Sequence, residues 1–389
     1  MSTCQLKNQA TILVAGMISA DPFQGGATWA VLQYVLGLAG LGHDVYFVEP
    51  IQRKAVRPEG ADLNSSANAA YFRQVVKEFG LERRATLLSG DGTETVGLSL
   101  EALRRVARQA RLLVNISGML EEESLLSPIP IRLYMDLDPA FIQLWSAEEG
   151  IDMRFAAHTH FATIGLALGE TDCPVPTCGL PWIKTKQPIV LERWPVAERL
   201  VDDAFTTVGN WRGYGSVSYR GSFYGQKAHS FRQFFELPTL SRERFILALA
   251  IHPDEERDLA ALRANGWVLR DPCAAAGDPW SYQRFIQGSL AEFGVAKSGY
   301  VVSRCGWFSD RSVCYLASGR PVVAQETGFS RFLPTGEGLL AFSSNQDALA
   351  AIEKIRRDYP RHCQSARQIA ESEFDSRGVL ARLLNKVGL

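Results

Sequence analysis

A polar loop in the second half of the chain has the clearest potential for chemistry. It reads Arg304-Cys-Gly-Trp-Phe-Ser-Asp-Arg311, follows an apolar run at Tyr300–Ser303 that is typical of a buried strand, and leads into a predicted helix at Arg311–Ala317. The first turn of a helix has backbone N–H groups without helical partners, and these groups attract anions. The spacing predicts a diphosphate site here, with an ordinary strand-to-helix turn capped by Asp310 as the alternative. The residues of the predicted site are Arg304, Gly306, Ser309, Asp310 and Arg311.

Alternating strand and helix patterns must position this loop. The chain opens with the apolar run Thr11–Met17, a turn-rich loop, a helical pattern that ends near Gly40, and a second strand pattern at Asp44–Glu49. Continuous apolar runs of this kind fill parallel sheets that are covered on both faces. A similar series begins at Phe205–Gly209. The pattern predicts an α/β protein with two Rossmann-like doubly wound domains, whose ligands bind at the carboxyl ends of strands.

The predicted domain boundary lies near a proline-rich segment. Residues 173–195 contain five prolines, which do not fit inside helices or central strands. A length of 389 residues also agrees with two domains at about 150 residues each. We therefore predict an N-terminal domain at 1–185, a C-terminal domain at 186–370, and a final helix at 371–389 that could cross back to the first domain.

Composition excludes several classes of protein. The 41 basic and 42 acidic residues give a net charge of -1, which disfavours a nucleic-acid partner because no global positive field is available to attract phosphates. No apolar run reaches the roughly 18 residues of a membrane span, so we expect at most peripheral membrane contact. The seven cysteines are odd in number and scattered, which favours reduced thiols and a cytoplasmic location. Cys173 and Cys178 lack further ligands nearby, so no metal is expected. We expect a monomer or a homodimer.

One segment carries a resemblance to a known family. The sequence YLASGRPVVAQETGFSRFLPTGEGLLAF, from Tyr315 to Phe342, resembles the nucleotide-sugar site of GT-B glycosyltransferases of the family 1 and 4 type. In that family a helix N-terminus holds the donor diphosphate, a Gly-x-Pro turn leads into the next strand, and the turn after that strand reaches the donor sugar. The resemblance assigns these roles to Gly306–Arg311, to Gly319–Pro321, and to the turn that includes Glu326 and Thr327. It implies a GT-B fold with two domains facing a central cleft, the first for the acceptor and the second for the donor.

The same resemblance assigns two glycine-rich loops. The first contains Gln24, Gly25 and Gly26, and it lies where the family has a loop that borders the acceptor and the donor diphosphate. A plain strand-to-helix turn is the alternative reading of this loop. Glu49, at the end of the next strand, is a candidate for ribose binding, although the dinucleotide fingerprint G-x-G-x-x-G is absent.

The second loop spans residues 210–227 and lies where the family often has a cation that contacts phosphate. Arg212 and Lys227 are the candidates, because a departing diphosphate gains negative charge. Aromatic residues in the loop could stack on a base or a sugar, and a structural hairpin is the alternative. These aromatic residues are Trp211, Tyr214 and Tyr219.

Sugar transfer also needs a base that activates the acceptor. Asp136 and Asp138 directly follow the predicted strand Ile131–Met135, and His158 lies in a short His-x-His segment. A carboxylate or an imidazole at a strand end suits this role. Each residue also has an ordinary explanation, because aspartate before proline forms turns and a histidine is often a packed, hydrogen-bonded residue. The predicted catalytic residues are Asp138, Asp136 and His158.

The chain departs from the family pattern at two positions. Many retaining members carry two glutamates, and counting back from the Ser-Gly-Arg-Pro turn places Gly306 and Cys314 there. Neither side chain is a carboxylate, so the nucleotide and the stereochemical course stay open, and Glu326 is the best acid nearby. We expect a metal-independent glycosyltransferase without a cofactor, which uses a nucleotide-sugar donor and an unidentified acceptor. The alternatives are a non-catalytic nucleotide-sugar-binding protein and a GT-B-fold nucleotide-sugar epimerase.

Overall fold

The computed structural model describes residues 9–213 and 215–389, and the chain divides into two compact units. The first unit contains Met1–Leu137, Asp152–Ala162 and Ser376–Leu389, and the second contains Asp138–Ile151 and Thr163–Asp375. The chain thus enters the second unit before residue 185, where we expected the boundary, and its last residues return to the first unit. Tyr214, a predicted stacking residue, lies outside the described residues.

The first unit supplies the strands up to β6 of an eight-stranded sheet, which has the order β4-β3-β2-β1-β5-β6-β7-β8. Neighbouring strands from β3 to β6 pair in parallel, and β4 pairs with β3 in the antiparallel sense. The order reverses beside β1, where the chain moves from one side of the sheet to the other. The strands are β1 (Thr11–Ala15), β2 (Asp44–Ile51), β3 (Ala85–Ser89), β4 (Thr95–Gly97), β5 (Ala110–Ile116), β6 (Ile131–Asp136) and β7 (His160–Thr163), the last of which ends in the second unit.

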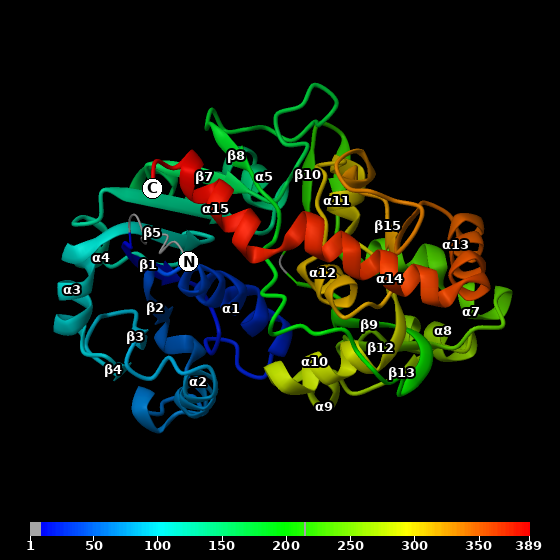
Figure 1. Cartoon of the computed structure of the whole chain (residues 1–389), viewed down its shortest axis with the longest axis horizontal. Helices are drawn as coiled ribbons and strands as arrows, with labels where there is room; N and C mark the ends of the chain where they lie inside the picture. Colours follow the sequence, from blue (N-terminus) through cyan, green and yellow to red (C-terminus); the bar gives the residue numbers. More distant parts are fainter. Residues whose placement is uncertain (1–8, 214) are drawn as a thin grey trace, which may run out of the picture. The chain divides into compact units, whose positions relative to one another are not determined.

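Helices follow the strands of the first unit, and the helix at the end of the chain, α15, packs on α1 (Figure 1). A Cβ atom at Gly37 of α1 would lie 2.6 Å from Cδ1 of Leu380 and 3.0 Å from Cβ of Ser376, so the glycine permits this close approach. The helices are α1 (Gly25–Gly40), α2 (Ala67–Glu78), α3 (Leu100–Gln109), α4 (Glu123–Leu126) and α15 (Ser376–Lys386). In the described parts of the chain, no helix is long and apolar enough to cross a membrane.

The second unit contains a six-stranded parallel sheet in the order β13-β12-β9-β14-β15-β16. This order also reverses beside its first strand, between β9 and β14. The strands are β9 (Asp202–Asn210), β12 (Phe245–Ala250), β13 (Val268–Leu269), β14 (Ser289–Gly294), β15 (Val322–Gln325) and β16 (Leu339–Phe342). The short strands outside this sheet are β8 (Trp182–Lys184), β10 (Val217–Tyr219) and β11 (Ser222–Tyr224), and the last two form a hairpin.

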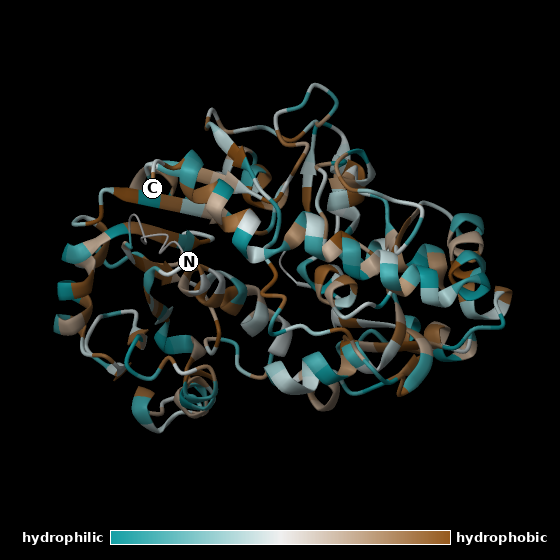
Figure 2. Ribbon diagram, in the orientation of Figure 1, coloured by the Kyte–Doolittle hydropathy of each residue, from teal (hydrophilic) through white to brown (hydrophobic). Residues whose placement is uncertain are grey.

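The helices from α6 to α12 lie between strands of this second sheet along the chain, α5 precedes the sheet, and α13 and α14 follow it. They are α5 (Phe141–Ala147), α6 (Lys227–Phe231), α7 (Leu237–Leu240), α8 (Glu256–Ala264), α9 (Pro272–Ala276), α10 (Pro279–Gly288), α11 (Ser298–Ser303), α12 (Asp310–Ala317), α13 (Asn345–Arg357) and α14 (Tyr359–Ile369). The hydropathy colouring of the ribbon shows largely apolar strands and helices with both apolar and polar parts, as expected for a sheet between helical layers (Figure 2).

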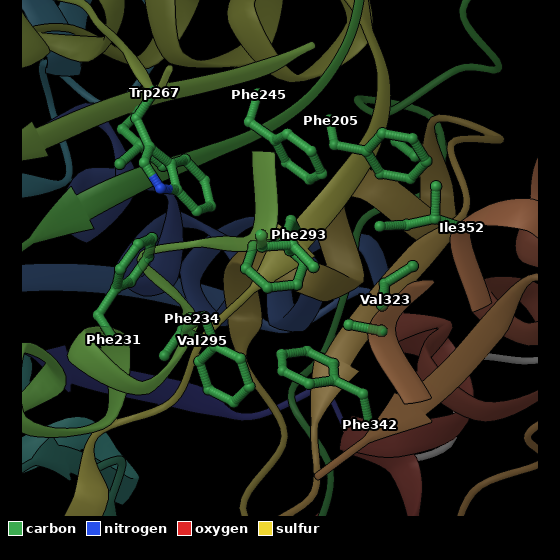
Figure 3. Close-up of a cluster of buried hydrophobic side chains, with 14 of the residues drawn as sticks. Phe205, Phe231, Phe234, Phe245, Trp267, Phe293, Val295, Val323, Phe342 and Ile352 are labelled. Carbon is green, nitrogen blue, oxygen red and sulfur yellow. The ribbon is translucent and has the colours of Figure 1, made fainter. Parts of the chain in front are cut away.

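An aromatic core fills one side of the second sheet. Phe293 of β14 lies among aromatic side chains from neighbouring strands and from α6, and its ring stacks on Phe342 with centroids 4.9 Å apart (Figure 3). Phe205, Phe245 and Trp267 belong to the same buried cluster. This core fixes β9, β14 and β15 relative to one another, and these strands end at the candidate site described below.

One element differs from our prediction. Tyr300–Ser303 is part of the helix α11 rather than a strand, and the strand before the polar loop is β14. In α11 the buried residues are Gly299, Tyr300 and Ser303, which is a helical spacing. We missed β14 because Glu292 interrupts its apolar run, and a charge in a central strand is rare unless it is paired.

Candidate functional site

The site that the second unit offers lies where its strand order reverses. In sheets of this type ligands bind outside the carboxyl ends of the strands at the reversal. The ends of β14 and β15 and the start of α12 surround a pocket with about 230 Å³ of empty space, its open mouth included. Residues that line this pocket include Gly294, Ala296, Trp307, Ser309, Arg311 and Gln325.

Arg311, in the first turn of α12, joins the two strands at the reversal. Its Nε donates to Oε1 of Glu292 on β14 at 2.6 Å, and its Nη1 donates to the carbonyl oxygen of Val208 on β9 at 3.1 Å. The Arg311 side chain is 11% exposed and that of Glu292 is fully buried. Burial alone would lower the pKa of Arg311, but the carboxylate of Glu292 outweighs burial and raises it. The guanidinium is therefore a permanent charge beside the pocket.

Lys227, at the start of α6, is a second buried cation in this region. Its Nζ donates to the carbonyl oxygen of Val295 at 2.7 Å, and the residue is 7% exposed. Burial, and then the positive charge of Arg311, lowers the pKa of Lys227 well below its usual value. An ammonium group has three donors, and this is the one hydrogen bond of Nζ in the part of the chain that the structure describes. A bound anion would supply the missing partners.

The loop between α11 and α12 is held by the turn after β15. The backbone N–H of Gly306 donates to the carbonyl oxygen of Thr327 at 2.8 Å, and the Thr327 hydroxyl donates to the carbonyl oxygen of Trp307. The Glu326 carboxylate accepts the N–H of Gly328 at 2.5 Å. Thus Thr327 holds the loop that would bind the diphosphate, and Glu326 stabilises the turn that carries Thr327.

The other predicted residues of this loop lie around the same helix start. Ser309 is buried at the N-cap position of α12, without a side-chain capping bond, and Asp310 is the first helical residue. Burial raises the pKa of Asp310, and Arg311 opposes this effect. Arg304 ends α11 in the left-handed conformation, with φ of 48°, and its side chain is exposed.

Asp138 belongs to the second unit and meets residues that follow β14. Its carboxylate accepts two hydrogen bonds from Nζ of Lys297, at 2.9 and 3.1 Å, and one from the hydroxyl of Tyr300. The Tyr300 ring stacks on Trp307, a residue of the pocket, with centroids 4.2 Å apart. Asp138 is therefore bound in an ion pair that adjoins the pocket, and its oxygens are engaged rather than open to a reacting hydroxyl.

Arg212, the other predicted phosphate contact, faces an acid. Its guanidinium pairs with the carboxylate of Glu255, and the side chain is 41% exposed. Its charge is thus already balanced, whereas Lys227 is buried beside Arg311. Of the two candidates, Lys227 has the environment that suits a phosphate contact better.

In the first unit, a buried glutamate fixes the glycine-rich loop. Both carboxylate oxygens of Glu49 are engaged: Oε1 accepts the N–H groups of Ser19 and Ala20 at 2.7 and 2.6 Å, and Oε2 accepts the Ser19 hydroxyl at 2.9 Å. Burial raises the pKa of Glu49 to about 7, while these hydrogen bonds oppose the shift. Glu49 thus positions a loop instead of presenting an oxygen to a ribose, which corrects our reading of this residue.

The loop ends in the first turn of α1. Gln24 precedes the helix, and its amide donates to the carboxylate of Asp21 at 2.6 Å. Gly25 and Gly26 are the first two residues of α1, where backbone N–H groups lack helical partners. All three predicted residues therefore lie at a helix start on the carboxyl-end side of β1, as an anion- or hydroxyl-binding loop requires.

Asp136 and His158 lie in the first unit. Asp136 is the last residue of β6 and is fully buried. The ring of His158 uses both nitrogens: Nδ1 lies 2.9 Å from the carbonyl oxygen of Arg154, and Nε2 lies 3.0 Å from the side-chain amide of Asn115. A carbonyl oxygen only accepts, so Nδ1 carries the proton and Nε2 accepts from the amide. These bonds leave His158 a structural role.

We expect His158 to make the protein less stable in acid. Burial lowers the pKa of His158 in the folded protein, whereas in the unfolded chain it stays near 6.5. The unfolded state therefore binds more protons below about pH 6.5, and the free energy of unfolding falls as pH decreases. Urea unfolding from pH 7.5 to 5 should show a shallower pH dependence for His158→Gln than for the wild type. His160→Gln is the control, and equal slopes for the wild type and His158→Gln would contradict the assignment.

Several residues of the site were not found from the sequence. Glu292 and Lys297 lie in and just after a strand that we did not predict, and Glu49 was given another role. A charged residue inside an otherwise apolar segment, as in Ser289–Gly294, was the available signal. Among the described residues, no group of three or more His, Cys, Asp or Glu side chains could hold a metal ion.

Comparison with known proteins gives matches only at the level of structure. No family model and no curated protein matches the sequence. An alpha-glucosyltransferase solved with UDP and a 13-mer DNA with an A:G mismatch is 11% identical, with 98% of this chain and 100% of that chain covered and a TM-score of 0.58. Anabaena HepE, solved with UDP and glucose, is 10% identical, with 98% and 100% covered and a TM-score of 0.57.

A third similar structure is a glycosyltransferase from Rickettsia africae, which is 11% identical, with 98% of each chain covered and a TM-score of 0.52. Identities this low carry no information about individual residues, but the likeness extends over nearly the whole length of every chain compared. Both strand orders described above are of the doubly wound type that this architecture uses twice. The chain therefore has the GT-B fold, with two Rossmann-like units, that the segment around Ser318-Gly-Arg-Pro321 led us to expect.

Proposed function

We propose that this chain is a glycosyltransferase that moves a sugar from a nucleoside-diphosphate sugar to an acceptor. One observation carries the proposal: cations gather at the ends of β9 and β14, beside the start of α12. Arg311 and Lys227 are buried there, and Lys297 is close enough to lower the pKa of Lys227 further. Two of the similar structures, which share the fold, were solved with UDP.

These groups suit the chemistry of a leaving diphosphate. When the bond between the sugar and the diphosphate breaks, the diphosphate gains negative charge, and fixed cations and helix N–H groups stabilise it. Arginine and lysine can do this without a metal ion, so we propose metal-independent transfer. The proposed donor-binding residues are Arg304, Gly306, Ser309, Asp310, Arg311, Lys227, Glu326 and Thr327.

The first unit supplies the proposed acceptor residues. Gln24, Gly25 and Gly26 stand at the start of α1, after the loop in which Glu49 holds Ser19 and Ala20, and Asp136 is the candidate base at the end of β6. The acceptor class is open. Because one similar enzyme was solved with DNA, an acceptor screen should include DNA beside sugars and small hydroxyl compounds, although the net charge of this chain disfavours DNA.

A donor panel tests the proposal directly. UDP-, GDP-, ADP- and dTDP-sugars are screened first for a rise in melting temperature and then for release of the nucleoside diphosphate with and without acceptors. We expect one nucleotide class to raise the melting temperature. We also expect the protein to hydrolyse the sugar of that class slowly. Binding without turnover would favour a non-catalytic binding protein, and conversion of the donor sugar without transfer would favour an epimerase. If no donor raises the melting temperature, the transferase proposal is wrong.

The variant Asp138→Asn shows whether Asp138 is a general base or a structural partner of Lys297 and Tyr300. Loss of a general base lowers kcat by about 10²- to 10⁴-fold. Because the carboxylate is engaged by Lys297 and Tyr300, we expect kcat to fall by less than about tenfold and the free energy of unfolding to decrease. Steady-state kinetics and urea unfolding measure both quantities. A fall in kcat of a thousandfold with unchanged stability would restore Asp138 as the base, and Asp136→Asn is the parallel variant.

A further inference from the structure

Glu292 is a fully buried acid in a central strand, and the sheet does not need it. Its neighbours across the sheet are Thr206 on β9 and Val322 on β15. Removing a carboxylate from water costs several kcal/mol, and well-packed apolar residues of similar volume are often as stable as a buried ion pair. A residue that fills space alone would therefore be apolar, so the charge at this position calls for a reason beyond the fold.

The carboxylate of Glu292 is half used. Oε1 accepts from Nε of Arg311, while Oε2 is buried without a hydrogen-bond partner in the segments that the structure describes. A Cβ atom at Gly294 would lie 3.0 Å from Oε1, so the glycine at the end of β14 gives the carboxylate its room. The incomplete satisfaction of Glu292 shows that its position is set by Arg311 and not by the best hydrogen bonding of the acid itself.

Two nitrogens of the Arg311 guanidinium are hydrogen-bonded to the protein, and the third nitrogen is available for a ligand. Nε is bound to β14 through Glu292, and Nη1 is bound to the carbonyl oxygen of Val208 on β9. Nη2 makes no hydrogen bond to the described residues, and Arg311 lines the pocket. A Cβ atom at Gly209 would lie 3.6 Å from Nη1, so a glycine adjoins the pair on this strand as well. The guanidinium is thus fixed in orientation, and both N–H groups of Nη2 are unused beside the pocket.

We propose that Glu292 is a positioning residue for donor binding, which holds Arg311 across the two strands so that its free N–H groups bind the donor diphosphate. This inference rests on the proposed function. Guanidinium groups bind phosphate oxygens through pairs of parallel hydrogen bonds, which require a defined orientation of the plane. Glu292 supplies that orientation, because a single bond to Val208 would leave the plane free to rotate. It also balances the charge of Arg311 while the pocket is empty.

The test measures UDP binding to the full chain by titration calorimetry. We expect Glu292→Gln to weaken UDP binding at least tenfold, with a smaller effect on UMP, which lacks the second phosphate. Glu292→Asp keeps the charge but has a shorter side chain, so its affinity for UDP should lie between those of the wild type and Glu292→Gln. The matched control is Asp202→Asn, which disrupts the bidentate pair of Asp202 with Arg270 at the opposite end of β9. This control should lose stability and keep its affinity for UDP.

A double-mutant cycle shows whether Glu292 acts through Arg311. Arg311→Met removes the partner of Glu292, and Glu292→Gln/Arg311→Met removes both charges. If Glu292→Gln alone does not fold, the double variant can still be tested, because it leaves no unpaired buried charge. We expect Glu292→Gln to have less than a twofold effect on UDP affinity when Arg311 is already methionine. Equal effects in both backgrounds, or wild-type affinity in Glu292→Gln, would overturn the positioning role. If the wild type binds none of UDP, GDP, ADP and dTDP, the proposed function on which the role rests is wrong instead.

Discussion

Lys227→Met is expected to make the folded protein more stable and to remove its affinity for a nucleoside diphosphate. Lys227 is 7% exposed, and burial followed by the charge of Arg311 lowers its pKa in the folded protein. The unfolded chain keeps the proton up to about pH 10.4, so unfolding takes up a proton at any pH between the two values. The free energy of unfolding therefore rises with pH across this window. Methionine, which is of similar length and uncharged, avoids this cost.

Thermal unfolding with and without UDP measures both effects. We expect the melting temperature of Lys227→Met to rise by a few degrees, since about 1 kcal/mol is worth roughly 2–4 °C in a domain of about 150–250 residues. In the wild type, UDP at 100 times its Kd should add about 2.7 kcal/mol of stability, and this increment should vanish in the variant. Lys354→Met, at an exposed position on α13, is the control. A destabilised variant that still responds to UDP would contradict both expectations.

The lowered pKa of Lys227 also leads to a prediction of how donor affinity depends on pH. Burial and the charge of Arg311 make the ammonium form of Lys227 less stable in the empty site, whereas a diphosphate stabilises that form. Binding should therefore be accompanied by proton uptake, and affinity should fall as pH rises. Calorimetric titrations in buffers with different ionisation enthalpies measure the number of protons taken up. In Lys227→Met this number should decrease.

Gly328→Ala is expected to be the most damaging small substitution at the site. Gly328 has a φ of 93°, and an added Cβ atom would lie 2.6 Å from the backbone carbonyl oxygen of Arg304. The left-handed conformation costs a side chain about 1–2 kcal/mol, and overpacking adds about 1–3 kcal/mol. Relief of the clash would move Arg304 away from the turn and break the hydrogen bond between Gly306 and Thr327. We expect loss of stability together with loss of nucleotide binding.

Gly336→Ala is the matched control for that substitution. Gly336 has a φ of 108°, but an added Cβ atom would meet nothing within 4 Å. It therefore shares the backbone strain of Gly328 without the clash. Urea unfolding should show the smaller loss for Gly336→Ala, and its nucleotide affinity should stay at the wild-type value. Equal losses in the two variants would mean that backbone strain alone, and not the fit of the loop, limits this site.

Much of the fold could be predicted from the sequence because its signals are local. Apolar runs such as Thr11–Ala15 and Val322–Gln325 are strands, and the helix that begins at Asp310 was expected within one residue. The segment around the Ser-Gly-Arg-Pro turn resembles GT-B glycosyltransferases, and this resemblance led to the correct fold. The strand β14 was missed because its signal is not local. Arg311, the partner that permits Glu292 to be buried, is on another element.

The sequence by itself determined the alternation of strands and helices, the GT-B fold, and the place of the polar loop before α12. Only the tertiary structure decided which charged side chains meet. Asp138 is 159 residues from Lys297, and Val208 is 103 residues from Arg311, so no local pattern could have paired them. An ion pair forms wherever the folded chain brings opposite charges together, and burial then decides their protonation. The roles of Glu292, Lys227 and Asp138 therefore became visible only once the strands were in register.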